Sequence, residues 1–180
     1  MNYLKSITLI ITLLFLIVSC NDKTETKEVN IEKVEVEEIN ISAETAAVKT
    51  VMKTYKDAIQ DLTTEGTLDL FTKEATVFES GGSEGTYKNY VEHHLGPELD
   101  HFNSFIFSDY KIDVVIDMPF AFVNETYIYT IDIKANEKRG TEARIIKKKG
   151  VATSDLKKID GKWKITKTHS SSRNIRKPSH

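Results

Sequence analysis

A single cysteine, Cys20, constrains the fold of this 180-residue chain more than any other residue. One cysteine cannot form an intrachain disulfide, so a folded domain must be held together by its hydrophobic core alone. Residues 42–175 have the length of one such domain and contain no internal repeat. We therefore expect one compact domain over residues 42–175, followed by a short tail at residues 176–180.

An uninterrupted apolar run leads up to Cys20. Lys5 precedes about a dozen apolar residues, which is the length of the apolar region of a secretory signal peptide. A transmembrane helix needs about 20 apolar residues, so this run is short for one. The ending Ile17-Val18-Ser19-Cys20 resembles the lipobox of bacterial lipoproteins, in which the cysteine becomes the first mature residue and carries lipid. This resemblance implies a signal peptide at residues 1–19, lipid on Cys20, and a domain held at a membrane of the bacterial cell envelope, outside the cytoplasm. The alternative is a free thiol at the end of an ordinary signal peptide or anchor helix.

The segment that follows Cys20 is acidic. Residues 21–41 carry seven acidic and three basic side chains, with no aromatic residue and no glycine. This composition favours a solvated tether over residues 20–41, although the loose alternation of apolar and charged residues also fits a short edge strand. Without Lys5, the 25 basic residues fall to 24 against 27 acidic ones, a net charge of −3. That charge, with no basic block, argues against a nucleic-acid partner.

The pattern of the domain predicts helices first and strands second. Ser42 is the expected N-cap of a first helix, and residues 68–71 resemble a short second helix. A third helix is expected over residues 87–95 and should stop or bend at Gly96-Pro97. The apolar stripe of the first helix consists of Val48, Val51, Met52, Tyr55, Ile59 and Leu62.

The rest of the domain reads as antiparallel sheet. A brief strand at residues 75–79 ends at Gly81-Gly82, and residues 105–116 and 121–133 flank a turn. The tight turn Asp160-Gly161 joins two further strands, at residues 144–159 and 163–171. Helices followed by a long, bent sheet indicate the α+β class.

This order of elements resembles the nuclear transport factor 2-like, or SnoaL-like, cone fold. The resemblance covers about residues 43–173 and rests on the helix with Tyr55, the Leu70-Phe71 helix, the Phe78-Glu79 strand and the final Gly161-Lys162-Trp163-Lys164-Ile165 hairpin. It implies helices packed in a strongly curved antiparallel sheet, a cystatin-like roll with a pocket inside the cone. Homodimerisation through the outer face of the sheet is a further expectation from the resemblance. The family includes isomerases, dehydratases, cyclases and docking modules, so the fold leaves the function open.

Strand pleating predicts which side chains face the pocket, because alternate residues share a face. Glu125 is the one carboxylate in an apolar and aromatic row on its strand. Counting from the turns places Glu125 opposite Ala152 and Ala152 opposite His169, with Glu125 and His169 about 10 Å apart at the backbone. The small residues Gly150 and Ala152 should leave room for a ligand. The inner face of the last strand is expected to carry Trp163, Ile165, Lys167, His169, Ser171 and Arg173.

One hypothesis for this pocket is a small acid–base enzyme. A carboxylate among apolar groups has a raised proton affinity and a histidine titrates near neutral pH, so Glu125 and His169 form the candidate catalytic pair. The tyrosines could donate hydrogen bonds to a carbonyl or an oxyanion, or simply pack the cone. The candidate ligand-binding residues are Tyr55, Tyr110, Tyr127, Tyr129, Trp163 and Arg173.

A second hypothesis is a pocket that binds a small molecule or a metal ion without chemistry. Zinc or copper would suit a site built from His93 or His94, Glu98, Glu125 and His169. This spacing is not a recognised metal signature, and the alternative is that these residues are ordinary polar groups. Two adjacent histidines on a helix point in different directions, so at most one should face the pocket. A protein-docking module is the third hypothesis, against which the lysine-rich outer face argues.

Overall fold

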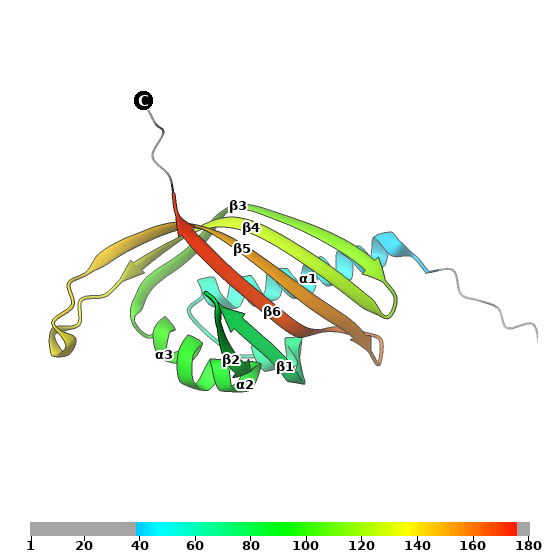
Figure 1. The fold of residues 1–180 in the computed structure, drawn as a ribbon, viewed down its shortest axis with the longest axis horizontal. Coiled ribbons are helices and arrows are strands. Elements are labelled where there is room, and N and C mark those ends of the chain that lie inside the picture. Colours follow the sequence, from blue (N-terminus) through cyan, green and yellow to red (C-terminus); the bar gives the residue numbers. More distant parts are fainter. Residues whose placement is uncertain (1–38, 176–180) are drawn as a thin grey trace, which may run out of the picture. The chain divides into compact units, whose positions relative to one another are not determined.

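The computed structural model describes residues 39–175. The predicted signal peptide, Cys20 and most of the predicted tether lie outside the described residues, as does the tail at residues 176–180. Within the described part, the chain forms an α+β fold in which helices pack against a curved, six-stranded sheet (Figure 1). No helix in this part is long and apolar enough to cross a membrane.

The first helix, α1 (Ile41–Gln60), begins two residues earlier than predicted. Its N-cap is Asn40 rather than Ser42, because the Asn40 side chain accepts a hydrogen bond of 3.0 Å from the backbone N–H of Ala43. The predicted short helix is the 3₁₀ helix η1 (Thr67–Leu70), and Phe71 already belongs to the next strand. Helix α1 lies along the sheet and contacts mainly β3 (Phe102–Asp117) and β6 (Lys162–Asn174).

The third predicted helix does not stop at Gly96-Pro97. It runs as α2 (Tyr87–Tyr90), the π-helix η2 (Val91–Leu95) and α3 (Gly96–Leu99). The wide π turn places the Gly96 N–H on the Val91 carbonyl, five residues back, and so accommodates the proline that follows. A Cβ at Gly96 would lie 2.6 Å from the Val91 carbonyl oxygen, which is why this turn needs glycine.

The sheet has the strand order β2-β1-β6-β5-β4-β3, in which β1 and β6 are parallel and all other neighbours are antiparallel. Strand β1 (Phe71–Glu79) is longer than predicted, and β2 (Gly82–Thr86) was not predicted at all. Strands β4 (Phe120–Ile133) and β5 (Arg144–Ile159) agree with the prediction, and η3 (Glu137–Arg139) lies in the loop between them.

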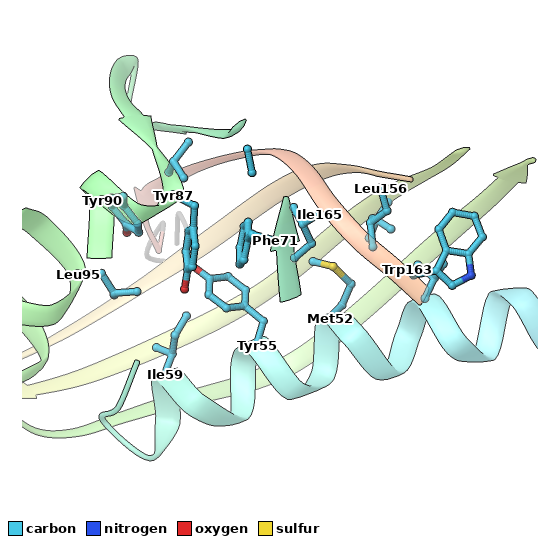
Figure 2. Packing of buried hydrophobic residues seen from close by; sticks show 14 of the residues in the cluster. Met52, Tyr55, Ile59, Phe71, Tyr87, Tyr90, Leu95, Leu156, Trp163 and Ile165 are labelled. Atoms are coloured by element: carbon cyan, nitrogen blue, oxygen red, sulfur yellow. The ribbon is translucent and has the colours of Figure 1, made fainter. Parts of the chain in front are cut away.

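The core fills the space between α1 and the concave side of the sheet. Figure 2 shows Met52, Tyr55 and Ile59 projecting from α1 toward side chains of the strands and of α2. The rings of Phe71 and Tyr87 stack at a centroid distance of 3.4 Å, and Tyr55 meets Phe71 edge to face at 5.2 Å. The predicted apolar stripe of α1 is therefore the face that the sheet covers.

A β-bulge changes the predicted register between β5 and β6. Between β5 and β6, Leu156 still pairs with Ile165 as predicted, but Asp155 pairs with Lys167, so Thr166 is an extra residue on β6. The Thr166 hydroxyl donates a hydrogen bond of 3.0 Å to the Asp155 carbonyl and so holds this bulge. A shift of one residue turns every following side chain of β6 to the other face of the sheet.

Candidate functional site

A cavity of about 140 Å³ lies inside the curve of the sheet. Its lining side chains come from α1, from the α2–η2–α3 segment and from all the long strands. The walls combine aromatic rings with charged and hydroxyl side chains, so a ligand would meet both apolar and polar surface. The residues that carry this character are Tyr55, Phe105, Phe107, Tyr127 and Tyr129, together with the ionisable Lys56, Glu79, Glu98 and Glu125.

Lys56 and Glu125 form a buried pair in the wall of this cavity, and the partly exposed Tyr110 on β3 contacts this pair. The Lys56 Nζ lies 3.0 Å from Oε1 and 3.1 Å from Oε2 of Glu125, and the Tyr110 hydroxyl donates a 2.5 Å hydrogen bond to Oε1. Lys56 is 7% exposed and Glu125 is 1% exposed. Burial lowers the pKa of Lys56, and the charge of Glu125 opposes this shift. Burial and the contact with Glu125 raise the pKa of Tyr110.

A second carboxylate, Glu79, faces the cavity from the end of β1. It accepts a 2.8 Å hydrogen bond from the hydroxyl of Tyr90 on α2. Burial, reinforced by the charges of nearby groups that include Glu79, raises the pKa of Tyr90, so this phenol stays protonated and acts as a donor.

A third carboxylate, Glu98, lines the cavity and belongs to a group of charges with His94 and Glu84. Its side chain is half exposed, and the His94 ring lies 3.4 Å from Glu98 through Nε2 and 3.0 Å from Glu84 through Nδ1. Burial, together with the charges of Glu79 and Glu84, raises the pKa of Glu98 against the opposing effect of His94. Partial burial disfavours the charged form of His94, but the hydrogen bond to Glu84 and the charges of Glu98 and Glu79 raise its pKa overall.

The structure confirms much of the predicted inner face. Glu125 pairs with Ala152, both line the cavity, and the tyrosines Tyr55, Tyr127 and Tyr129 line it with them. The predicted room beside Gly150 is occupied, because the Tyr127 ring packs directly over this glycine. Tyr110 does not pair with Tyr127 as predicted, since a bulge at Asp109 and Tyr110 interrupts the β3–β4 register. Tyr110 nevertheless reaches Glu125.

The bulge at Thr166 overturns the predicted position of His169. Ala152 pairs with Ser170, and His169 pairs with Thr153 on the exposed outer face of the sheet. Glu125 and His169 therefore do not share the cavity, and Thr168, Ser170 and Ser172 take the inner positions instead. Arg173 is exposed and pairs with Lys149 rather than lining the cavity.

Trp163, a predicted ligand-binding residue, belongs to the core instead. Trp163 is buried in the core, and its indole N–H donates a 2.8 Å hydrogen bond to Glu44 on α1, so it is not part of the cavity wall.

His93 is exposed, whereas His94 is partly buried, as expected for neighbours on one helix. Among residues 39–175, no three or more histidine, cysteine, aspartate or glutamate side chains come together as a metal-binding group. The predicted set of His93, His94, Glu98, Glu125 and His169 is thus not assembled.

Sequence reasoning missed several residues of the cavity wall, among them Glu79, the inward serines and above all Lys56. Lys56 lies four residues after Met52 and three before Ile59, inside the apolar stripe of α1. A lysine at a buried position of an amphipathic helix is a signal for a buried partner, and that partner is Glu125. The inward serines were missed because the bulge that turns them inward leaves no mark in the alternation of the strand.

Comparison with solved structures identifies the class of fold. The chain is similar to a candidate dehydratase of the NTF2-like family from Streptomyces avermitilis, with a TM-score of 0.62, 12% identity, and coverage of 74% of this chain and 99% of that one. A ketosteroid isomerase-like protein from Erwinia carotovora atroseptica gives a TM-score of 0.60 at 16% identity, covering 76% and 100%. A protein with a cystatin-like fold from Caulobacter vibrioides gives 0.58 at 14% identity, covering 72% and 89%.

These likenesses show that the chain has the nuclear transport factor 2-like cone fold, as its sequence predicts. No protein-family model matches the chain, and no curated protein matches it in sequence. At identities of this size, similarity of structure defines the fold and leaves the ligand or reaction to the site itself.

Proposed function

We propose that this protein is a ligand-binding module whose cone holds one small organic molecule. The observation that carries this proposal is the cavity of about 140 Å³, which is walled by aromatic rings and contains the buried pair Lys56–Glu125. A cavity in which aromatic walls and polar groups of perturbed pKa converge is a common mark of a binding site.

The buried pair supports recognition of a polar group on the ligand. A buried ion pair contributes little net stability, because the loss of hydration offsets the attraction between the charges. Lys56 and Glu125 therefore add more to the chemistry of the cavity than to the stability of the core. The Tyr129 hydroxyl, which donates a 2.9 Å hydrogen bond to Ser172, supplies a further polar contact at the wall.

We also propose that the domain is displayed as a bacterial lipoprotein. The support is the apolar run that ends at Ile17-Val18-Ser19-Cys20, together with the acidic segment that separates Cys20 from α1. Lipid on Cys20 would hold the cone at a membrane of the cell envelope, and the cavity would then meet small molecules outside the cytoplasm.

The test of the binding function is to fill the cavity. Ala152→Phe and Ser170→Phe each place a ring in the cavity, and their matched controls are Thr153→Phe and His169→Phe on the outer face. Ligand-observed NMR with a panel of small aromatic and aliphatic compounds should show binding to the wild type and the controls, and loss of binding in both plugged variants. Circular dichroism confirms that each variant is folded. Equal binding by plugged and control variants would contradict the proposal.

A second candidate function is acid–base chemistry on the bound molecule. The observation that favours it is the raised pKa of Glu98, a half-exposed carboxyl on the cavity wall beside His94. If the protein is such an enzyme, Glu98→Gln abolishes turnover of a bound carbonyl compound while its binding persists. Turnover that is unchanged in Glu98→Gln would remove this candidate.

A further inference from the structure

We propose that the molecule bound in the cone is an organic cation, namely an amine or quaternary ammonium group attached to an apolar body. This inference rests on the proposed binding function and adds the charge and the chemical class of the ligand. It is carried by the arrangement of carboxylates and aromatic rings around the cavity.

The charges that line the cavity do not balance. Among the described residues, the cavity is lined by one lysine, Lys56, and by three carboxylates, Glu79, Glu98 and Glu125. Lys56 is engaged by both oxygens of Glu125. Glu79 accepts a hydrogen bond from the neutral Tyr90 hydroxyl, and the partner of Glu98 is the titratable His94. Two carboxylates in the described structure therefore face the cavity without a lysine or arginine ion pair.

The cavity that these carboxylates face is also lined by aromatic rings, a surface that suits a cation. Phe105 and Tyr129 lie 5.6 Å apart between ring centroids, and Phe107 meets Tyr127 at 5.0 Å. The negative face of an aromatic ring attracts an ammonium group within about 6 Å, most strongly where water is excluded. Carboxylates and rings together would therefore hold an organic ammonium ion in this cavity.

The protein already holds one ammonium group in this way. The Lys56 Nζ lies 5.1 Å from the Phe107 ring centroid and 5.0 Å from that of Tyr127, while Glu125 neutralises its charge. A ligand ammonium beside Glu79 and Glu98 would repeat this combination of rings and carboxylate. Lys56 occupies Phe107, Tyr127 and Glu125, whereas Phe105, Tyr129, Glu79 and Glu98 line the same cavity outside this contact.

The same arrangement disfavours other classes of ligand. An anionic ligand would be repelled by Glu79 and Glu98, since opposite rather than like charges are stabilised in a site of low dielectric. A bare metal ion needs several ligating side chains at one point, and residues 39–175 contain no such group. An organic cation uses both the rings and the carboxylates.

Isothermal titration calorimetry with three probes of one size tests this inference. Benzylammonium, benzyl alcohol and benzoate share a benzene ring and differ in charge. Titrated into the full chain in a non-ionic detergent, with detergent-only blanks, benzylammonium should bind about tenfold more tightly than benzyl alcohol, and benzoate more weakly than either. In Glu79→Gln/Glu98→Gln, the affinity for benzylammonium should fall to that for benzyl alcohol, while Glu74→Gln, an exposed carboxylate on the same strand, changes nothing.

Three outcomes would each overturn the inference. Benzoate could bind as tightly as benzylammonium, or the preference for benzylammonium could survive the double substitution. Benzylammonium could also fail to bind at millimolar concentration. Two other outcomes separate a wrong ligand class from a wrong binding function. If all three probes bind equally and Ala152→Phe abolishes their binding, the cavity is a site without a preference for cations. If the probes bind equally well to Ala152→Phe, the cavity is not the binding site.

Discussion

The Nζ of Lys56 on α1 lies 3.0 Å from the Oε1 of Glu125 on β4, and both side chains are buried. This contact joins residues 69 positions apart in the chain and links the first helix to the sheet. Because the pair lines the cavity, it links the packing of the helix to the chemistry of the candidate site.

Replacing Lys56 alone should be costly. Lys56→Met leaves the Glu125 carboxylate buried without its cation, and we expect the free energy of unfolding to fall by about 3–5 kcal/mol. The matched control is Lys53→Met, which breaks the exposed ion pair with Asp57 on the same helix and should cost at most about 1 kcal/mol. Urea denaturation followed by circular dichroism measures both.

The double variant Lys56→Met/Glu125→Leu separates the loss of the pair from the loss of one charge. Without either charge the core is apolar, so we expect most of the lost stability to return. If Lys56→Met is no more destabilised than Lys53→Met, Lys56 and Glu125 do not form a buried ion pair.

Gly150 is required by the ring that packs over it. A Cβ at this position would lie 2.2 Å from the Cε2 of Tyr127, so Gly150→Ala must displace this ring from the cavity wall. We expect a loss of about 1–3 kcal/mol in unfolding free energy, as for other overpacked cores. Gly82→Ala is the matched control, since its Cβ would make only an ordinary contact of 3.5 Å with the Glu79 carbonyl.

Thermal unfolding of both glycine variants gives the comparison, and ligand-observed NMR shows whether the displaced Tyr127 also weakens binding. Equal stability of Gly150→Ala and Gly82→Ala would mean that Tyr127 has another position in solution.

The contribution of His94 to stability should depend on pH. Its pKa in the folded protein lies above the ordinary 6.5, since the hydrogen bond to Glu84 and the charges of Glu98 and Glu79 outweigh partial burial. The folded state therefore binds the proton more tightly than the unfolded state, so this contribution is complete below pH 6.5 and is lost as the pH rises through the folded pKa.

Chemical denaturation of wild type and His94→Gln across this range measures the effect. The difference in unfolding free energy should shrink as the pH rises. His93→Gln, at an exposed neighbouring position, is the matched control for the loss of an imidazole. A difference that grows with pH would contradict the ion pairs of His94 with Glu84 and Glu98.

Most of the strand framework could be predicted from the sequence, because turn residues and alternation determine it locally. The pairing of Glu125 with Ala152 followed from counting outward from the turns, and the structure has the same pairing. The β-bulge at Thr166 could not be predicted in this way, since one extra residue leaves composition and alternation nearly unchanged. That single residue moved His169 from the expected catalytic row to the outer face.

The site was predicted less completely than the fold, since its partners come from distant elements. Glu125 was recognised as unusual because it interrupts an apolar row, but its partner Lys56 becomes evident only when α1 is placed against the sheet. The π turn at Val91–Leu95 was equally hidden, since Gly96-Pro97 normally indicates the end of a helix.

Lipidation of Cys20 can be tested apart from the fold. When the full chain is expressed in a bacterial host fed an alkyne fatty acid, the wild-type protein should carry the label, because fatty acyl chains become attached at the lipobox cysteine. Several such chains anchor a lipoprotein stably. Cys20→Ala should lose the label, while Ser19→Ala keeps the acceptor thiol and should retain it. Label that remains on Cys20→Ala would contradict the lipoprotein assignment.

The position of a bound organic cation tests the central claim most directly. A crystal structure of the protein with benzylammonium, at a concentration that saturates binding in solution, should show the ring between the aromatic walls and the ammonium beside Glu79 and Glu98. Density for the ligand on the outer face of the sheet, or a cavity that stays empty at that concentration, would contradict the account.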